Sequence, residues 1–446
     1  MNRSLTLAAL AVLLPAVGLT GCDVLNPKPT ASVEASEALT TPRQAEIVLN
    51  SVYDRMQNQN DISIIFNDLV SDNARHSGSY PTWLQIDTYT YEPTNVDIQN
   101  RWSGMYSVIN AANEIIEKVP GIAPTGTLTE TRRGEIVGEA KAMRAYAYLQ
   151  LVNWFGDVPL LLAPTKSATD AGIFPTRSPV AAVYTQIIKD LTEAEVALGT
   201  ANRPASFIDV WAVKGLLSRV YLYQGRWLDA ENKATEVIGN PAFSLATPAT
   251  LWEGGGGSEI LWALTYVAGS DPNNMSFFGY PSNAGGRYEY APTTELNGLF
   301  TAGDLRKPYT IRTVSSALTV GKYFRTSTDD DPVYLVRLGE VYLNRAEARA
   351  RQTGKETLAL ADMAAIRTRA GLGALPSLTG TPLLDAIYNE RRLELAFEGH
   401  RWFDLKRTGK AIATLGIPNG DTKYLLWPIP RRDLDVNDKL TQNPGY

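Results

Sequence analysis

The 446-residue chain has little of the residue types on which several kinds of chemistry depend. With one cysteine it can form no internal disulfide and no cysteine-rich zinc site, and two histidines leave little for a histidine-based metal centre. The 42 Lys and Arg against 47 Asp and Glu give a formal charge of -5, which provides no basic excess for nucleic acid. We therefore expect no metal site, no cofactor and no nucleic-acid partner.

The single cysteine follows a short apolar segment at the N-terminus. Arg3 precedes an apolar run from Leu5 to Leu19, which is shorter than the roughly 20 residues that a helix needs to span a bilayer and is typical of a signal peptide. The sequence Leu19-Thr20-Gly21-Cys22 then resembles the lipobox of bacterial lipoproteins. We predict a signal peptide over residues 1–21 and lipidation of Cys22. The alternative is an ordinary signal peptide followed by an incidental free cysteine.

The rest of the chain divides into a tether and a folded domain. Residues 22–40 contain Pro27, Pro29 and small polar residues, which predict a flexible tether. No later segment reaches a spanning length without charges or turn residues, so we expect the membrane to be contacted only through the lipid anchor. Residues 41–446 are expected to form a single domain, with an irregular insert at about 240–332.

The fold class is predicted to be all-α, or mostly helical. Apolar residues recur every three or four positions, which predicts a helix that starts at Pro42 and further helices over residues 96–118, 130–154 and 179–198. Residues 211–234 and 333–369 are expected to be helical hairpins with turns at Gly225 and Gly354, and their small residues are typical of tetratricopeptide repeats. Because one such pair cannot bury its apolar face alone, about four stacked pairs are expected.

Residues 240–332 differ in composition from the helical segments. Glycine occupies positions 254–257 and 285–286, several prolines occur, and residues 259–267 form a short aliphatic and aromatic run. This composition predicts loops with short strands. Long irregular segments inside a compact domain are often functional.

The most specific motif lies at residues 389–407, NERRLELAFEGHRWFDLKR. It resembles the signature of the SusD/RagB family of Bacteroidetes outer-membrane lipoproteins. Further similar blocks occur, in the family's order, at residues 149–160, 334–348, 366–372, 426–430 and 440–446.

The resemblance implies a nutrient-binding protein and not an enzyme. Members of the family capture an oligosaccharide or a similar nutrient at the cell surface and close like a lid over a SusC-like TonB-dependent outer-membrane barrel. Their fold is a helical body of four tetratricopeptide-like pairs, with loops and short strands on the ligand face. The expected location is therefore the outer membrane, where the protein is lipid-anchored and faces the cell surface.

Family members recognise glycans with aromatic residues from a loop in the N-terminal third and from the irregular region. Sugar rings stack on aromatic side chains, and their hydroxyls need polar partners. The matching aromatics, by region, are Tyr80, Trp83, Phe277, Phe278, Tyr280, Tyr288 and Tyr290, with Asn73, Asn283 and Arg287 as hydrogen-bonding residues. For each aromatic, burial as a loop anchor is an equal alternative. We assign Trp102, Tyr106, Trp154 and Trp211 to packing because they sit at helical core spacing.

Acidic residues in the signature need a separate interpretation. Glu390, Glu394 and Glu398 fall four residues apart on one face of a predicted helix, a spacing that also fits paired catalytic carboxylates. Nearby helices carry Arg337, Arg345, Arg349, Arg367 and Arg369, which favour a buried ion network. For His400 we expect packing or a hydrogen bond, because no pattern supplies it with a nucleophile.

Three functions stay open. The first is a glycan-binding surface lipoprotein that works with a SusC-like transporter. The second keeps that partner but exchanges the glycan for a peptide or another nutrient. The third is a surface glycoside hydrolase. It is disfavoured because the signature glutamates are expected to form an ion network, and the sequence has no HExxH, Gly-x-Ser-x-Gly or phosphate-loop motif that would support another kind of enzyme.

Overall fold

The computed structural model describes residues 39–165, 174–199 and 203–446. The predicted signal peptide, Cys22 and most of the tether lie outside these residues. Leu39, placed in the tether by its sequence, is buried, so the packed domain begins two residues before the predicted boundary. Within the described ranges, no helix is long and apolar enough to cross a membrane.

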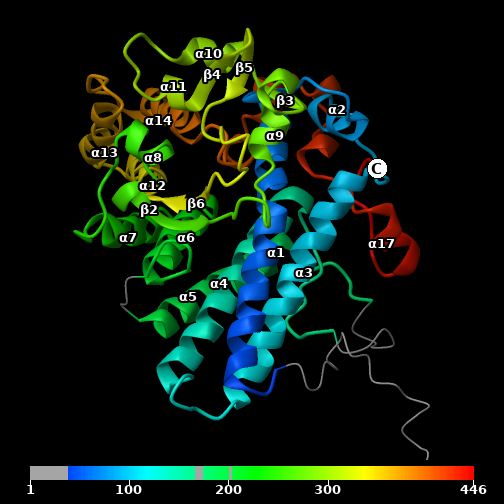
Figure 1. Cartoon of the computed structure of the whole chain (residues 1–446). Coiled ribbons are helices and arrows are strands. Elements are labelled where there is room, and N and C mark those ends of the chain that lie inside the picture. The colour runs from blue at the N-terminus through cyan, green and yellow to red at the C-terminus, as the bar shows by residue number, and fades with distance from the viewer. Residues whose placement is uncertain (1–38, 166–173, 200–202) are drawn as a thin grey trace, which may run out of the picture. The chain divides into compact units, whose positions relative to one another are not determined.

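Two pairs of long helices form the first half of the domain (Figure 1). Helix α1 (Pro42–Leu69) packs against α3 (Val96–Lys118), and α4 (Glu130–Phe155) packs against α5 (Val180–Leu198). Thr41 and Gln44 form a capping box at the start of α1, and the side chains of Asn95 and Thr129 cap α3 and α4. These side chains satisfy the first free N–H groups, which is why the predicted starts are correct.

Two further pairs complete the helical scaffold. They are α6 (Val210–Tyr223) with α7 (Trp227–Ile238), and α12 (Leu338–Ala350) with α13 (Glu356–Arg369). Gly225 and Gly354 adopt the positive φ angles that the two turns require. The chain thus has the predicted mostly helical, tetratricopeptide-like fold with four pairs.

One predicted helix is wrong in its first turn. Residues Val333–Arg337 form strand β6, which pairs antiparallel with β2 (Ile260–Leu264), and α12 starts only at Leu338. All five residues of β6 are buried. A short, fully buried apolar run has no amphipathic period, so the sequence pattern cannot distinguish such a strand from the start of a buried helix.

The irregular region contains short strands, as predicted, and also short helices, which its composition did not indicate. It holds α8 (Pro248–Trp252), α9 (Met275–Gly279), β3 (Tyr290–Pro292), α10 (Thr294–Leu299), α11 (Lys307–Thr310), and the hairpin of β4 (Ile311–Val314) with β5 (Ala317–Val320). Strand β1 (Ala74–His76) pairs antiparallel with β3, with Arg75 opposite Ala291. This pairing brings the loop of the N-terminal third beside the irregular region.

The remaining elements are further helices and short 3-10 turns. They are α2 (Pro81–Asp87), α14 (Gly380–Leu395), α15 (Arg401–Arg407), α16 (Ala411–Leu415), α17 (Arg431–Val436), and the 3-10 turns Val119–Gly121, Gly257–Glu259, Ser282–Ala284, Pro418–Gly420 and Thr422–Leu425. Trp154 stacks on Trp427 with ring centroids 5.0 Å apart. Trp102 and Trp154 are buried, and Tyr106 and Trp211 pack against the core while partly exposed.

Candidate ligand-binding site

Aromatic side chains from both predicted loop regions meet beside α2 and α9. The ring of Phe278 lies 6.1 Å from that of Tyr80 and 5.3 Å from that of Phe277, centroid to centroid. The guanidinium of Arg287 lies 4.2 Å above the Tyr80 ring, a cation–π contact. All four side chains are partly or fully exposed. We call Tyr80, Phe277, Phe278 and Arg287 the aromatic patch.

Buried aromatic side chains connect the patch to the helical core. Trp83 is 3% exposed, and its ring lies 5.0 Å from Phe278 and 5.2 Å from Phe66. Phe66 in turn contacts Trp427, which stacks on Trp154 in the helical core. Since these rings interlock edge to face and by stacking, the patch rests on the helical core and not on loops alone.

Glu289 ties the two loops together. Its carboxylate accepts hydrogen bonds from the backbone N–H groups of Ser79 (2.7 Å) and Tyr80 (3.0 Å), and from Nε of Arg287 (2.9 Å). Burial acts to raise the pKa of Glu289, but hydrogen bonds from Arg287, Tyr80 and Ser79 outweigh it and lower the pKa below its ordinary value. The carboxylate is therefore ionised at neutral pH and fixes Arg287 over Tyr80.

Two glycines permit the close approach of these loops. A Cβ atom at Gly78 would lie 2.1 Å from Oε2 of Glu289, and one at Gly286 would lie 2.1 Å from the carbonyl oxygen of Tyr280. The second contact is with backbone, which cannot rotate away. Gly286 is thus required by the packing of the loop and not by its own φ angle.

The ten residues predicted from the sequence divide into two groups. Tyr80, Phe277, Phe278, Asn283, Arg287 and Tyr288 are partly or fully exposed around the patch. Asn73, Trp83, Tyr280 and Tyr290 are buried, so in this structure they anchor the loops and do not face a ligand. Asn73, for example, donates to Asp68 (2.8 Å) and accepts from Arg392 (3.2 Å), while the Tyr290 hydroxyl donates to the carbonyl of Met275.

Glu289, Ser79 and Gly78 were not singled out in the sequence, and Gly286 was noted only as part of a glycine pair. Glu289 stands between Tyr288 and Tyr290, but no local pattern indicates that it binds Ser79, which lies 210 positions earlier. The sequence holds only an indirect signal for this contact. A Ser-Tyr pair and an Arg-Tyr-Glu-Tyr segment, each of which follows a glycine, lie in the two regions that were assigned to the ligand face.

The glutamates of the signature belong to a buried ion network, as predicted. Arg337 donates to Glu259, Glu394 and Glu398, with distances of 2.7, 2.6 and 2.6 Å. Burial acts to raise the pKa of Glu394, but Arg369, Arg337 and Arg306 lower it well below its ordinary value. Arginines therefore hold Glu394 ionised, an arrangement that suits structure and not proton transfer.

Three details of that network differ from the prediction. Helix α14 ends at Leu395, so Glu398 lies in the following turn and not on the same helix face. Arg345 and Arg349 bind Asp362 instead of the signature glutamates. Arg306 and Lys322, which come from the irregular region, complete the network by binding Glu390, Glu394 and Glu398. Arg306 and Lys322 lie far from the signature along the sequence, so a helical spacing pattern could not predict that they bind its glutamates.

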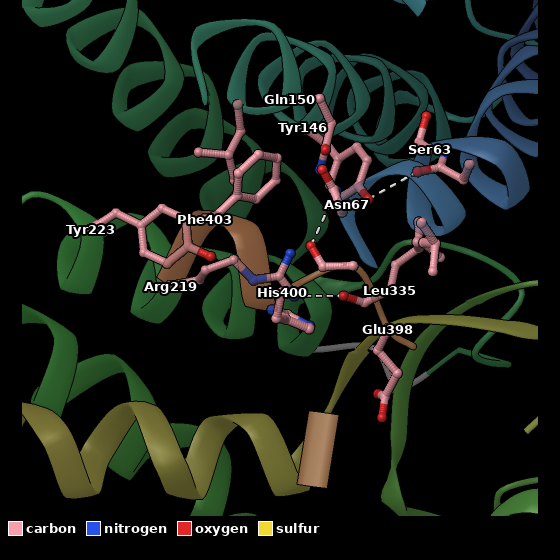
Figure 2. Close-up of a pocket in the computed structure, with 14 residues that line it drawn as sticks. Ser63, Asn67, Tyr146, Gln150, Arg219, Tyr223, Leu335, Glu398, His400 and Phe403 are labelled. Carbon is pink, nitrogen blue, oxygen red and sulfur yellow. Dashed lines mark hydrogen bonds between the residues drawn. The ribbon is translucent and has the colours of Figure 1, made fainter. Parts of the chain in front are cut away.

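His400 lies beside a small internal cavity of about 20 Å³ (Figure 2). Figure 2 shows it next to Arg219, whose guanidinium donates to the carbonyl of Leu335 (2.6 Å) and to Glu340 (2.6 Å). Burial lowers the pKa of His400 to about 4, and Arg219 and Arg391 act in the same direction, so the imidazole is neutral at physiological pH. A cavity of this size is comparable to one water molecule and cannot admit a sugar ring.

Possible metal ligands are scattered. In residues 39–165, 174–199 and 203–446, no three His, Cys, Asp or Glu side chains are grouped so that they could hold a metal ion.

Comparisons with known proteins agree with the fold and extend over most of the chain. Residues 306–421 match the family described as "SusD family", and residues 24–222 match the one described as "Starch-binding associating with outer membrane". "SusD-like protein P38" of Formosa agariphila is 28% identical over 96% of both chains. "Starch-binding protein SusD" of Bacteroides thetaiotaomicron is 34% identical over 26% of this chain and 22% of its own length.

A solved structure supports the same assignment. The "Laminarin binding SusD-like protein" superposes with a TM-score of 0.80 at 27% sequence identity, covering 91% of this chain and all of its own. Together with the signature at residues 389–407 and the four helix pairs, these matches show that the chain belongs to the SusD/RagB family.

Proposed function

We propose that the protein is a cell-surface lipoprotein that binds an oligosaccharide at the aromatic patch and delivers it to a SusC-like TonB-dependent transporter. The observation that carries the proposal is the patch itself, in which the rings of Tyr80 and Phe277 are partly exposed and the guanidinium of Arg287 is fixed over Tyr80. Apolar faces of sugar rings stack on aromatic side chains, and their hydroxyls accept from a guanidinium. Relatives whose names describe starch and laminarin binding support a glycan as the ligand.

Polar groups at the edge of the patch suit a neutral polyhydroxylated ligand. The side chain of Asn283 is exposed and makes no hydrogen bond within the described part of the chain. Arg287 uses Nε for Glu289, which leaves the N–H groups of its two terminal nitrogens for a ligand. The charge of Arg287 is already matched by Glu289, so an anionic ligand gains little there.

Binding without turnover is part of the proposal. Glycoside hydrolysis requires two carboxyl groups at the scissile bond, one of them able to give up a proton. Glu289 is 1% exposed and committed to the loops, and the signature glutamates are enclosed by arginines. Neither set is available to an exposed sugar.

The decisive experiment for this proposal is titration calorimetry of the purified protein with laminarin, with starch and with a mixed peptide pool, followed by analysis of the glycans for products. We expect binding of at least one glycan and no products. Released oligosaccharides would show a hydrolase, and binding of peptides alone would replace the glycan by a peptide cargo.

The anchor and the partner rest on the lipobox and on the family. We propose that Cys22 is acylated, that the protein is held at the outer membrane by this anchor, and that it faces the cell surface above the barrel. Labelled palmitate should enter the wild-type protein and not Cys22→Ser. Cross-linking in intact cells should recover a TonB-dependent barrel; its absence would contradict the lid role.

A further inference from the structure

A cleft opens between α10, α14, α15 and α16, and it has no lining residue in common with the aromatic patch. Its volume is about 600 Å³, which lies in the usual range for small-molecule sites. Its charged and amide side chains are Asp72, Glu295, Asp385, Asn389, Arg392, Arg401 and Lys410. Three of them, Asn389, Arg392 and Arg401, belong to the signature at residues 389–407.

One wall of the cleft is fixed by paired charges. Asp72 accepts two hydrogen bonds from Arg401, from Nε and Nη2, each 2.7 Å long. Arg392 forms an ion pair with Asp72 (3.1 Å) and donates to Glu295 (2.9 Å). Because these side chains are held by one another, a ligand would not have to order them, which lowers the entropic cost of binding.

Exposed groups in the cleft can meet a ligand, and they include Glu295, whose side chain stays largely exposed while paired with Arg392. Asn389 is exposed, and its amide makes no hydrogen bond within the described part of the chain. The Glu295 side chain is 65% exposed. Leu299 is 41% exposed, and Leu393 is partly exposed beside it. The cleft thus offers hydrogen-bonding groups next to small apolar surfaces.

The charges in the cleft balance. Asp72, Glu295 and Asp385 oppose Arg392, Arg401 and Lys410, so the formal sum is zero. Both arginines are already paired, which disfavours a phosphate or another anion. We infer that the cleft is a second binding site of this protein, and that it takes a short neutral saccharide.

Asp72 of the cleft and Tyr80 of the aromatic patch lie on one continuous segment of the chain. Asp72 stands two residues before β1, and Tyr80 stands four residues after it, so the backbone between them spans at most ~26 Å at ~3.3 Å per residue. A glycan long enough to reach both sites would bind more tightly than a short one, because the second contact is then intramolecular.

Saccharide binding at the cleft can be measured in a variant that lacks the aromatic patch. The probes are maltoheptaose and laminarin oligosaccharides, titrated into the full chain carrying Tyr80→Ala and Phe277→Ala. We expect a residual binding event, weakened at least tenfold when Asn389→Trp fills the cleft. The matched control is Asn100→Trp, which replaces an exposed asparagine on α3 and should leave the residual affinity unchanged.

The outcomes separate this inference from the proposed function. Wild-type binding that disappears entirely with the patch, or residual binding that Asn389→Trp leaves intact, would overturn the cleft and keep the proposed function. Binding of neither saccharide by the wild type would count against both. Circular dichroism of each variant checks that a lost signal reflects the site and not the fold.

Discussion

Replacing Arg337 by methionine should destabilise the domain severely. The side chain is 1% exposed and donates five hydrogen bonds: to both oxygens of Glu398, to one oxygen each of Glu259 and Glu394, and to the Glu394 carbonyl. Methionine has a similar volume and no charge, so three buried carboxylates lose their shared partner. Breaking a buried ion pair by removing one partner costs about 3–5 kcal/mol in the free energy of unfolding.

The assay is urea unfolding at pH 7, followed by tryptophan fluorescence. Arg312→Met is the control, since Arg312 makes one partly exposed ion pair with Glu253, and such pairs contribute at most ~1 kcal/mol. Arg337→Lys, which keeps one charge, should lose less stability and covers the case in which Arg337→Met does not fold. A loss for Arg337→Met as small as that for Arg312→Met would refute the network as a determinant of stability.

The pH dependence of this loss follows from the lowered pKa values of Glu394 and Glu398. A carboxyl with a lowered pKa stabilises the folded state above its unfolded pKa near 4.5, and that contribution falls as the pH drops through the folded value. Without Arg337, the carboxylates of Glu394 and Glu398 take up protons more readily as the pH falls, which removes the repulsion between their negative charges. The stability gap between the wild type and Arg337→Met should therefore be full at pH 7 and narrow as the pH falls below about 4.5.

Further predictions concern single positions. Burial raises the pKa of Asp68 from 3.8 to about 7, so between these values the folded state binds a proton that the unfolded state has lost. The free energy of unfolding should therefore fall as the pH rises from about 4 to 7. In Asp68→Asn, urea unfolding across the same range should not show this fall. Gly286→Ala should lower the melting temperature, whereas Gly126→Ala, whose added Cβ meets nothing within 4 Å, should not. Trp83→Ala should cost about 3–5 kcal/mol of stability in urea unfolding, and an unchanged midpoint would contradict its role as an anchor.

Local signals predicted most of the helical scaffold. Apolar spacing located the helices that Thr41, Asn95 and Thr129 cap, and Gly225 and Gly354 marked the hairpin turns, because helical periods and positive φ angles depend on near neighbours. The start of α12 was misplaced because a buried strand lacks an amphipathic period.

The site was predictable only by region. The family resemblance indicated two segments, and the pairing of β1 with β3 joins them. Which aromatics are exposed depends on what packs over them: Trp83 is covered by Phe66 and Phe278, while Phe277 stays partly open. The contact between Glu289 and Ser79 links distant parts of the chain, and no single-sequence pattern encodes such a pair.

The most direct test of the account is the glycan affinity of Phe277→Ala, measured by titration calorimetry against the glycan that the wild type binds. The matched control is Phe207→Ala, which removes another exposed phenylalanine from a different part of the domain. Loss of one stacking platform should weaken binding at least tenfold in Phe277→Ala and leave Phe207→Ala like the wild type. Equal affinity of Phe277→Ala and the wild type would contradict binding at the aromatic patch.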